Sequence, residues 1–267
     1  MKEKLTKEEF AKKMKAQRES LFDLANSQLS IIVSDPHKFT SFLALMATIN
    51  YTVNNSLLVY AQKPYAKELK SLDKWQEINV KVNKGEKGIQ ILEPSGEFIK
   101  RDGSKGISYS PRYVFDISQT SCHQDKEFNV SLETIRQGLL DNNCPIVVSS
   151  DPTQLSPVEY DAKANQINVL EGISFKEELN GLFKAYAYKE GLDMIDSSKI
   201  EFISSCVGYM LSIRFHVPSY NTFPFTGVMD RYFKNLDPRA IKNELNMIYK
   251  VYKPIKDRIN YGIYTRK

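Results

Sequence analysis

Cationic and aromatic side chains gather in one stretch of the sequence, between residues 75 and 113. Binding of single-stranded nucleic acid requires this combination, because cations follow the phosphate backbone while aromatic rings stack on the bases. Glycine adds to such a site, because its backbone amide lets a phosphate approach closely. The candidate contacts are Trp75, Lys81, Lys84, Gly85, Lys87, Arg101, Lys105, Tyr109, Arg112 and Tyr113.

Some of these residue types have a competing interpretation. A tryptophan packs in a core as readily as it stacks on a base, and we weigh Trp75 both ways. Phe115 lies in an apolar run and is better explained as core. Tyr109 and Tyr113, in a polar setting, are better candidates for stacking, and Tyr51, Tyr60 and Tyr65 are further candidates.

A β-hairpin is expected to position this cluster. The KGEKG run at 84–88 predicts a turn whose glycines take positive φ. Residues 89–92 predict a strand ended by Pro94, and residues 112–117 predict its partner. We expect the polar, glycine-containing segment 96–110 to form a flexible hairpin tip.

Helices are expected before the hairpin. A capping box at Thr6 begins a helix over 7–31, and Asp35-Pro36 begins another that Asn50 ends. Two more are predicted over 53–61 and 66–76. Beside these elements lie the amides of Asn54, Gln62 and Gln119, which either hold the neighbouring loop in shape or contact the nucleic acid.

The second half of the chain predicts an alternation of strands and helices. Strand signals lie at 145–149 and in a hairpin from Tyr160 to Leu170. Helical stripes follow over 174–190 and 199–215, and a last helix opens at Pro238 with a kink expected at Pro254. With a short helix at 131–140, the whole chain is predicted to be α+β.

Metal-dependent hydrolysis finds little support among the residues. Zinc peptidases need two histidines one helical turn apart and a glutamate base. The chain has three histidines, His37, His123 and His216, none with a partner at that spacing. The three cysteines are far apart and form no metal-binding motif. We therefore expect no metal, no other cofactor and no catalytic residue.

Composition fits a soluble protein of the cytoplasm. Of the 267 residues 42% are hydrophobic, and the net charge of +5 permits a polyanionic partner without requiring one. The first residues carry frequent charges and no apolar run, so we expect no signal peptide and no membrane partner. Nothing in the sequence indicates the oligomeric state.

Several anchors in order resemble one known family. They are Tyr51, Asn54, Leu57, Leu58, Gln62, Pro64, Ala66, Trp75, Val82, the KGEKGI segment at 84–89, Ile91, Leu92, Pro94 and the VFDISQT segment at 114–120. Residues 5–125 are thereby similar to the N-terminal single-stranded DNA-binding domain of ArdC-type antirestriction proteins. These proteins are carried by conjugative plasmids, integrative elements and phages.

The second half resembles the zincin-like metallopeptidase domain that follows in the same family. The resemblance places Asn180, Gly181 and Lys184 at the positions of the HExxH motif. It places Ile203 or Glu201 where a third, acidic ligand would lie. With both histidines and the glutamate replaced, the resemblance implies a catalytically dead domain lacking HExxH.

These arguments lead to a two-domain hypothesis. Residues 1–125 would form a helical and β-hairpin domain for single-stranded DNA, and residues 126–267 a degenerate peptidase-like domain with a basic C-terminal helix. The expected function is sequence-tolerant DNA binding that protects the incoming DNA of a mobile element or phage from host restriction.

Three alternatives stay open at this point. The second domain is also suited to capture and inhibit a host defence or replication protein. A peptidase with unusual ligands is the least favoured reading. The basic C-terminal helix is either a solvated surface or a second nucleic-acid contact.

Overall fold

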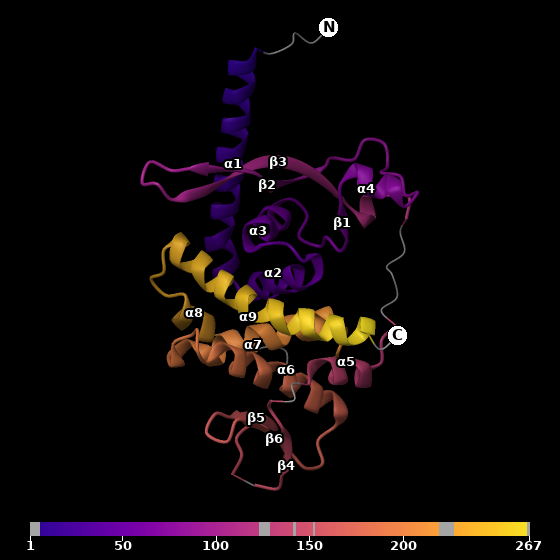
Figure 1. Ribbon diagram of the computed structural model, residues 1–267, viewed down its shortest axis with the longest axis vertical. Coiled ribbons are helices and arrows are strands. Elements are labelled where there is room, and N and C mark those ends of the chain that lie inside the picture. Colours follow the sequence, from indigo (N-terminus) through magenta and orange to yellow (C-terminus); the bar gives the residue numbers. More distant parts are fainter. Residues whose placement is uncertain (1–5, 123–128, 141–142, 152, 219–226, 266–267) are drawn as a thin grey trace. The chain divides into compact units, whose positions relative to one another are not determined.

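The computed structural model describes residues 6–122, 129–140, 143–151, 153–218 and 227–265. The predicted linker at 122–128, including His123, thus lies almost wholly outside the described residues. Two compact units divide the chain (Figure 1). One comprises Met1–Leu45 with Ile49–Asp125, and the other Met46–Thr48 with Lys126–Lys267. Each unit combines helices with a three-stranded sheet, so the predicted α+β class is confirmed.

The first unit joins helices to a long hairpin. Its sheet has the order β1-β3-β2, with both pairings antiparallel. Its elements are α1 (Lys7–Val33), α2 (Pro36–Ile49), α3 (Val53–Gln62), β1 (Leu69–Lys70), α4 (Leu72–Glu77), β2 (Ile89–Ile99), β3 (Lys105–Asp116) and the 3-10 turn η1 (Ile117–Gln119).

Local capping signals set the helix starts. The Thr6 hydroxyl accepts from the Glu9 amide while the Glu9 carboxylate accepts from the Thr6 amide, which completes the predicted capping box. The Asp35 carboxylate accepts from the His37 amide at 2.7 Å, so α2 begins as predicted. Asn50 ends α2 in the left-handed conformation, with φ of 55°.

The helix predicted over 66–76 is wrong in its first half. Leu69 and Lys70 instead form β1, which pairs with Asp116 and Phe115 of β3. The helix begins only at Leu72, after the Ser71 hydroxyl accepts from the Lys74 amide. Pairing with a strand more than forty residues away overrides the local helical preference.

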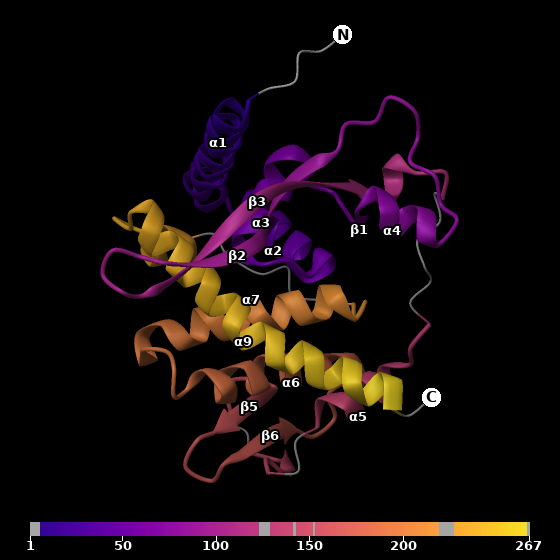
Figure 2. The same cartoon turned by 45° about the horizontal axis from the view of Figure 1, so that its top comes forward.

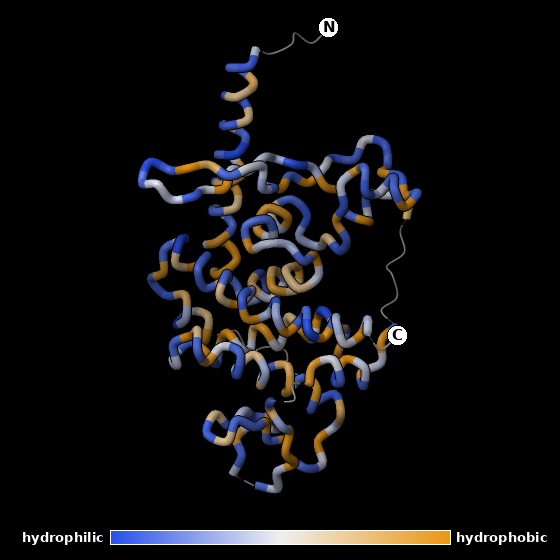
Figure 3. The backbone as a smooth tube through the Cα atoms, viewed as in Figure 1, coloured by the Kyte–Doolittle hydropathy of each residue, from blue (hydrophilic) through white to orange (hydrophobic). Residues whose placement is uncertain are grey.

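The hairpin is longer than the sequence predicted. Strand β2 does not end at Pro94 but continues to Ile99, with a register shift between Pro94 and Gly96. Proline is tolerated there because β2 is an edge strand, which needs hydrogen bonds on one side only. The tip is therefore confined to residues 100–104, and its turn is hydrophilic, whereas α2 is largely apolar (Figure 3).

One face of this sheet lies on the core of the first unit. The core cluster takes alternate residues of the hairpin and apolar residues of α2 and α3. Its members are Leu45, Ile49, Val59, Ala66, Ile89, Ile91 and Val114. Because successive strand residues point to opposite faces, the neighbours of Ile89, Ile91 and Val114 face away from this cluster.

Two side-chain amides of α3 cover the free edge of β2. The Asn55 amide donates to the Leu92 carbonyl at 2.9 Å and accepts from the Leu92 amide at 3.0 Å. The Gln62 amide makes the same pair of bonds with Gln90, both at 2.9 Å. Each amide replaces one residue of a missing neighbouring strand, so the edge is satisfied at Gln90 and Leu92 without a further strand.

The second unit packs helices with a smaller sheet (Figure 2). This sheet has the order β4-β6-β5, in which β4 is parallel to β6. Its elements are α5 (Leu132–Leu139), β4 (Ile146–Ser149), β5 (Val158–Asp161), β6 (Gln166–Leu170), α6 (Phe175–Gly191), α7 (Ser197–Arg214), α8 (Val228–Tyr232) and α9 (Pro238–Thr265). All but α8 were predicted, and α9 continues through Pro254.

Within the described ranges no single helix is long and apolar enough to cross a membrane. Helices α2 and α3 pass that test only when joined, across a bend of 114°.

The edge amides generate a stability prediction. Replacing Asn55 by Ala leaves both backbone groups of the buried Leu92 without partners. We expect the free energy of unfolding to fall by about 2–4 kcal/mol, measured by urea titration. Gln62→Ala is the matched control, with a loss of about 1 kcal/mol or less, because water replaces an exposed amide. Equal losses for both variants would contradict this account.

Candidate nucleic-acid interface

The hairpin face opposite the core presents aromatic and apolar side chains. Tyr113, Tyr109 and Ile107 occupy alternate positions of β3 and therefore point to the same face. Tyr113 is 52% exposed and Ile107 53% exposed, while Tyr109 is half-buried. The Tyr113 hydroxyl accepts from the Gln90 amide at 2.7 Å, which holds the ring in one orientation.

The candidate cations lie at two ends of the hairpin rather than in one cluster. Lys81, Lys84 and Lys87 belong to the loop that enters β2, whereas Arg101 and Lys105 lie at the tip. A strand rises by about 3.3 Å per residue, so the two ends are roughly 30 Å apart. The cations therefore bracket the tyrosine-bearing face of the predicted hairpin.

The entry loop carries the freest cations. The side chains of Lys81, Lys84 and Lys87 are exposed and make no ion pair with any described residue. Arg112 and Lys105, by contrast, lie 3.8 Å from Glu93 and 3.3 Å from Glu97. An anion approaching the loop meets three lysines against the single carboxylate of Glu86, whereas one approaching the strands competes with carboxylates paired to the cations.

The two loop glycines have different roles. Gly85 takes the predicted positive φ, 90°, and a Cβ there would have nothing within 4 Å. Gly88 does not take positive φ, contrary to expectation. A Cβ there would lie 3.0 Å from the Tyr113 ring, so Gly88 serves close packing against the tyrosine.

Trp75 is removed from the candidate contacts. It is 1% exposed, and its indole N–H donates to the Phe115 carbonyl at 2.9 Å. The Lys70 ammonium lies 4.3 Å from the ring centroid and also pairs with Glu68. The tryptophan therefore anchors α4 to β3 and has no free face for a base.

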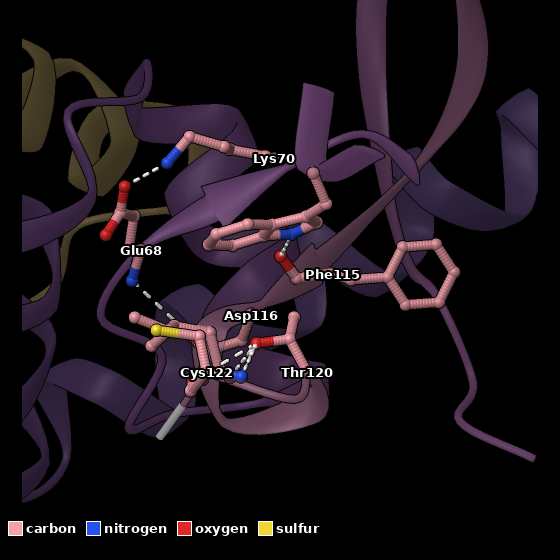
Figure 4. A network of polar contacts seen from close by, with 8 residues as sticks. Glu68, Lys70, Phe115, Asp116, Thr120 and Cys122 are labelled. Carbon is pink, nitrogen blue, oxygen red and sulfur yellow. Dashed lines mark hydrogen bonds and ion pairs between the residues drawn. The ribbon is translucent and has the colours of Figure 1, made fainter. Parts of the chain in front are cut away.

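A buried carboxylate next to Trp75 organises the end of the hairpin. One Asp116 oxygen accepts from the Lys67 amide at 2.7 Å and from the Glu68 amide at 3.2 Å. The other accepts from the Ser118 amide and hydroxyl. Figure 4 shows Asp116 between Glu68 and Thr120. The DISQT motif is thus structural. Ser118 and Gln119 cap Asp116 locally, whereas Lys67 and Glu68 lie 49 and 48 residues away and could not be read from local spacing.

Gln119 and Gln62 hold neighbouring backbone segments in place, which is the first of the two alternatives that the sequence left open for these amides. The Gln119 amide accepts from the Asp116 amide at 3.0 Å and donates to the Lys87 carbonyl and the Glu86 carboxylate, both at 2.9 Å. It therefore pins the basic loop to the hairpin end. The side-chain nitrogen and oxygen of Gln62 are both hydrogen-bonded, to backbone groups of α3 and β2. Asn54 is half-buried on α3.

Two further tyrosines are structural. The Tyr60 ring meets Phe42 edge to face, and its hydroxyl donates to the Lys38 carbonyl at 3.2 Å. Tyr51 packs on the core cluster. Burial raises the pKa of both hydroxyls above the usual range, so both stay neutral. Tyr65, in contrast, is 82% exposed.

Comparisons with known proteins now bear on this geometry. No family model and no curated protein matches the chain. Among solved structures, the metal-free antirestriction ArdC protein of plasmid R388 is similar with a TM-score of 0.60, 17% identity and coverage of 90% of this chain and 99% of that one. The chain has the ArdC fold.

The Mn(II)-bound structure of the same protein gives an equal TM-score and identity, with coverage of 89% of this chain and 98% of that one. The ArdC resemblance expected from the sequence is therefore confirmed at the level of the fold, along nearly the whole chain. The Mn(II) in that relative also makes it necessary to ask whether this chain's residues suit a metal.

The residues at the expected HExxH positions of α6 do not suit a metal. The Asn180 amide donates to the Lys176 and Pro218 carbonyls, both at 2.9 Å, and accepts from the Ser212 hydroxyl at 2.6 Å. The Lys184 ammonium forms an ion pair with Glu201, the acidic residue expected near the third ligand position. The carboxylate that a metal ion would need as a ligand is thus already paired with the Lys184 ammonium.

Gly181 leaves no room for a glutamate base. A Cβ built there would lie 2.5 Å from the Val158 side chain of β5, closer than real contacts allow. In the described part of the chain no three His, Cys, Asp or Glu side chains are grouped to hold a metal ion. The donor set and the packing of α6 on β5 therefore both disagree with a metal centre at this place.

The close approach at Gly181 predicts a destabilising substitution. Gly181→Ala should lower the free energy of unfolding by about 1–3 kcal/mol, because the added methyl overlaps Val158. Combined with Val158→Ala, which makes space, the loss should be smaller than the sum of the single losses by about 0.5 kcal/mol or more. Strict additivity in urea titrations would contradict the contact.

Metal addition gives a second test. After treatment with EDTA, added Mn²⁺ or Zn²⁺ should leave the Tm unchanged, because a ligand raises Tm only if it binds the folded state. Differential scanning fluorimetry measures this, with Mg²⁺ as a control for ionic strength. A rise in Tm specific to Mn²⁺ or Zn²⁺ would show that other residues hold a metal.

Proposed function

We propose that this chain is an ArdC-type antirestriction protein that binds single-stranded DNA through the β2–β3 hairpin of its first unit. The observation that carries the proposal is the exposed Tyr113 face on an ArdC fold, bracketed by cations at both hairpin ends. Lys84 and Lys87 take phosphates at one end, and Arg101 takes them at the other.

The geometry favours a single strand over a duplex. Aromatic rings stack on bases only where base faces are accessible, and a duplex hides those faces. Tyr113 is held by Gln90, so little conformational freedom is lost when a base stacks on it. The contacts are to phosphates and ring faces rather than to base edges, which makes the binding tolerant of sequence.

The loop that meets the phosphates is held in place before binding. The Gln119 amide fixes the Lys87 carbonyl at 2.9 Å, while the lysine side chains of the loop stay in solvent. A rigid protein loop with flexible lysine side chains suits a nucleic-acid strand whose phosphate positions vary with sequence. Coating a strand in this way shields its phosphates and bases from other proteins, which is how the antirestriction effect would arise.

The second unit is proposed to be a non-enzymatic scaffold. Asn180 and Lys184 are committed to internal contacts, and Gly181 has no side chain to serve as a base. Capture of a host defence or replication protein by this unit stays a prediction, because none of the contacts described above identifies a partner.

Binding to oligonucleotides tests the proposal. We expect fluorescence anisotropy to give at least tenfold higher affinity for a single-stranded oligonucleotide than for the same sequence as a duplex. The affinity should fall with added salt, with a slope near −0.7 for each phosphate contact. Equal affinity for the two forms would overturn the proposal.

Charge reversal locates the contact. Lys84→Glu with Lys87→Glu should weaken single-strand binding by about tenfold or more and flatten the salt dependence, because two phosphate contacts are lost. Lys163→Glu with Lys234→Glu is the matched control, since these lysines are exposed, lie in the second unit and give the same change in charge. Equal weakening by both pairs would mean that net charge alone drives binding.

A further inference from the structure

The first half of α1 is a helix without a core to bury. None of its residues from Lys7 to Ser20 is buried, and burial begins only at Leu21. Its first turns extend past the hairpin (Figure 1, Figure 2). An isolated helix of this length is marginal in water, yet the capping box at Thr6 stabilises its start. This first half of α1 therefore adds no buried side chain to the core of its own unit.

One face of this half-helix points toward the hairpin. Gln17 lies on it, since its amide nitrogen is 3.5 Å from the Tyr113 hydroxyl. Met14, Lys13 and Phe10 precede Gln17 by three, four and seven residues and share its face. The surface so defined combines an exposed aromatic ring, Phe10 at 56% exposure, with a cation.

The opposite face has a different character. Lys12 and Lys15 lie there together with Glu8 and Glu19, and Lys15 is 3.9 Å from Glu19. On the hairpin side Lys13 lies within the face, with Lys7 and Arg18 at one border and Glu9 at the other. The Glu9 carboxylate accepts hydrogen bonds from the Thr6 cap. The face toward Tyr113 therefore keeps a net positive charge, whereas the charges of the outer face balance.

Both surfaces meet at the crossing of α1 and β3. Tyr113, Tyr109 and Ile107 lie on the hairpin face that α1 contacts, and Phe10 and Lys13 lie on the α1 face that looks toward it. An angle lined by rings on both sides, with a net positive charge on the α1 side, suits a chain of bases and phosphates. A second copy of this chain would bring like charges together at the same place.

We propose that the first half of α1 is the second wall of the nucleic-acid site. A single strand lies in the angle between α1 and β3, with phosphates against Lys13 and Arg18 and a base against Phe10. This inference rests on the proposed function, and it adds a contact surface outside the predicted hairpin cluster.

Two pairs of substitutions on one helix test the inference. Lys13→Glu with Arg18→Glu should weaken binding of a single-stranded oligonucleotide by about tenfold or more. Lys12→Glu with Lys15→Glu changes the charge equally on the outer face and should weaken it less than threefold. Phe10→Ala should also weaken binding, with an unchanged salt slope, because it removes stacking rather than a phosphate contact. Circular dichroism and urea titration verify that each variant is folded, and Lys13→Glu alone serves if the half-buried Arg18 proves necessary for folding.

The outcomes separate the two proposals. If the unmodified protein does not prefer single strands, the proposed function fails. If it does, but the two pairs weaken binding equally or not at all, only the inference about α1 is overturned. A change of mass in light scattering caused by the Lys13 and Arg18 pair, without a change in DNA affinity, would overturn it in favour of self-association.

Discussion

The hydrogen bonds between α3 and the edge of β2 are the constraint on which the first unit depends. A hairpin of this length has an open edge, and an open edge pairs with other chains or frays. Asn55 and Gln62 close the first part of this edge with side-chain amides at Leu92 and Gln90. The hairpin is thereby fixed to the helical core along one side, so that its other face keeps a constant orientation toward solvent.

The candidate interface follows from that fixation. Trp75 and the Asp116 carboxylate lock the far end of β3, and Gln119 carries the same rigidity into the basic loop. The frame is satisfied by internal hydrogen bonds, whereas the lysines of the loop make no ion pair with described residues. Rigid backbone and uncompensated charge together are what a binder of flexible polyanions needs.

In the second unit, the residues that the sequence resemblance places at the HExxH positions are all engaged in internal contacts. Asn180 makes three hydrogen bonds, Lys184 pairs with Glu201, and Gly181 allows α6 to approach Val158 closely. Each of these residues is thus integrated into the packing of the unit.

The sequence by itself determined the helix starts, most strands, the α+β class and the ArdC fold. Caps such as Thr6–Glu9 and Asp35–Pro36 act within four residues, so local spacing is sufficient to predict them. The absence of paired histidines is likewise a property of composition. The tertiary structure alone decided that Trp75 is buried, that Gln62 and Gln119 are clamps, and that the cations separate to two ends of the hairpin. Those outcomes depend on partners 28 to 40 residues away. Strand register and helix packing select such partners, and spacing along the chain does not encode them.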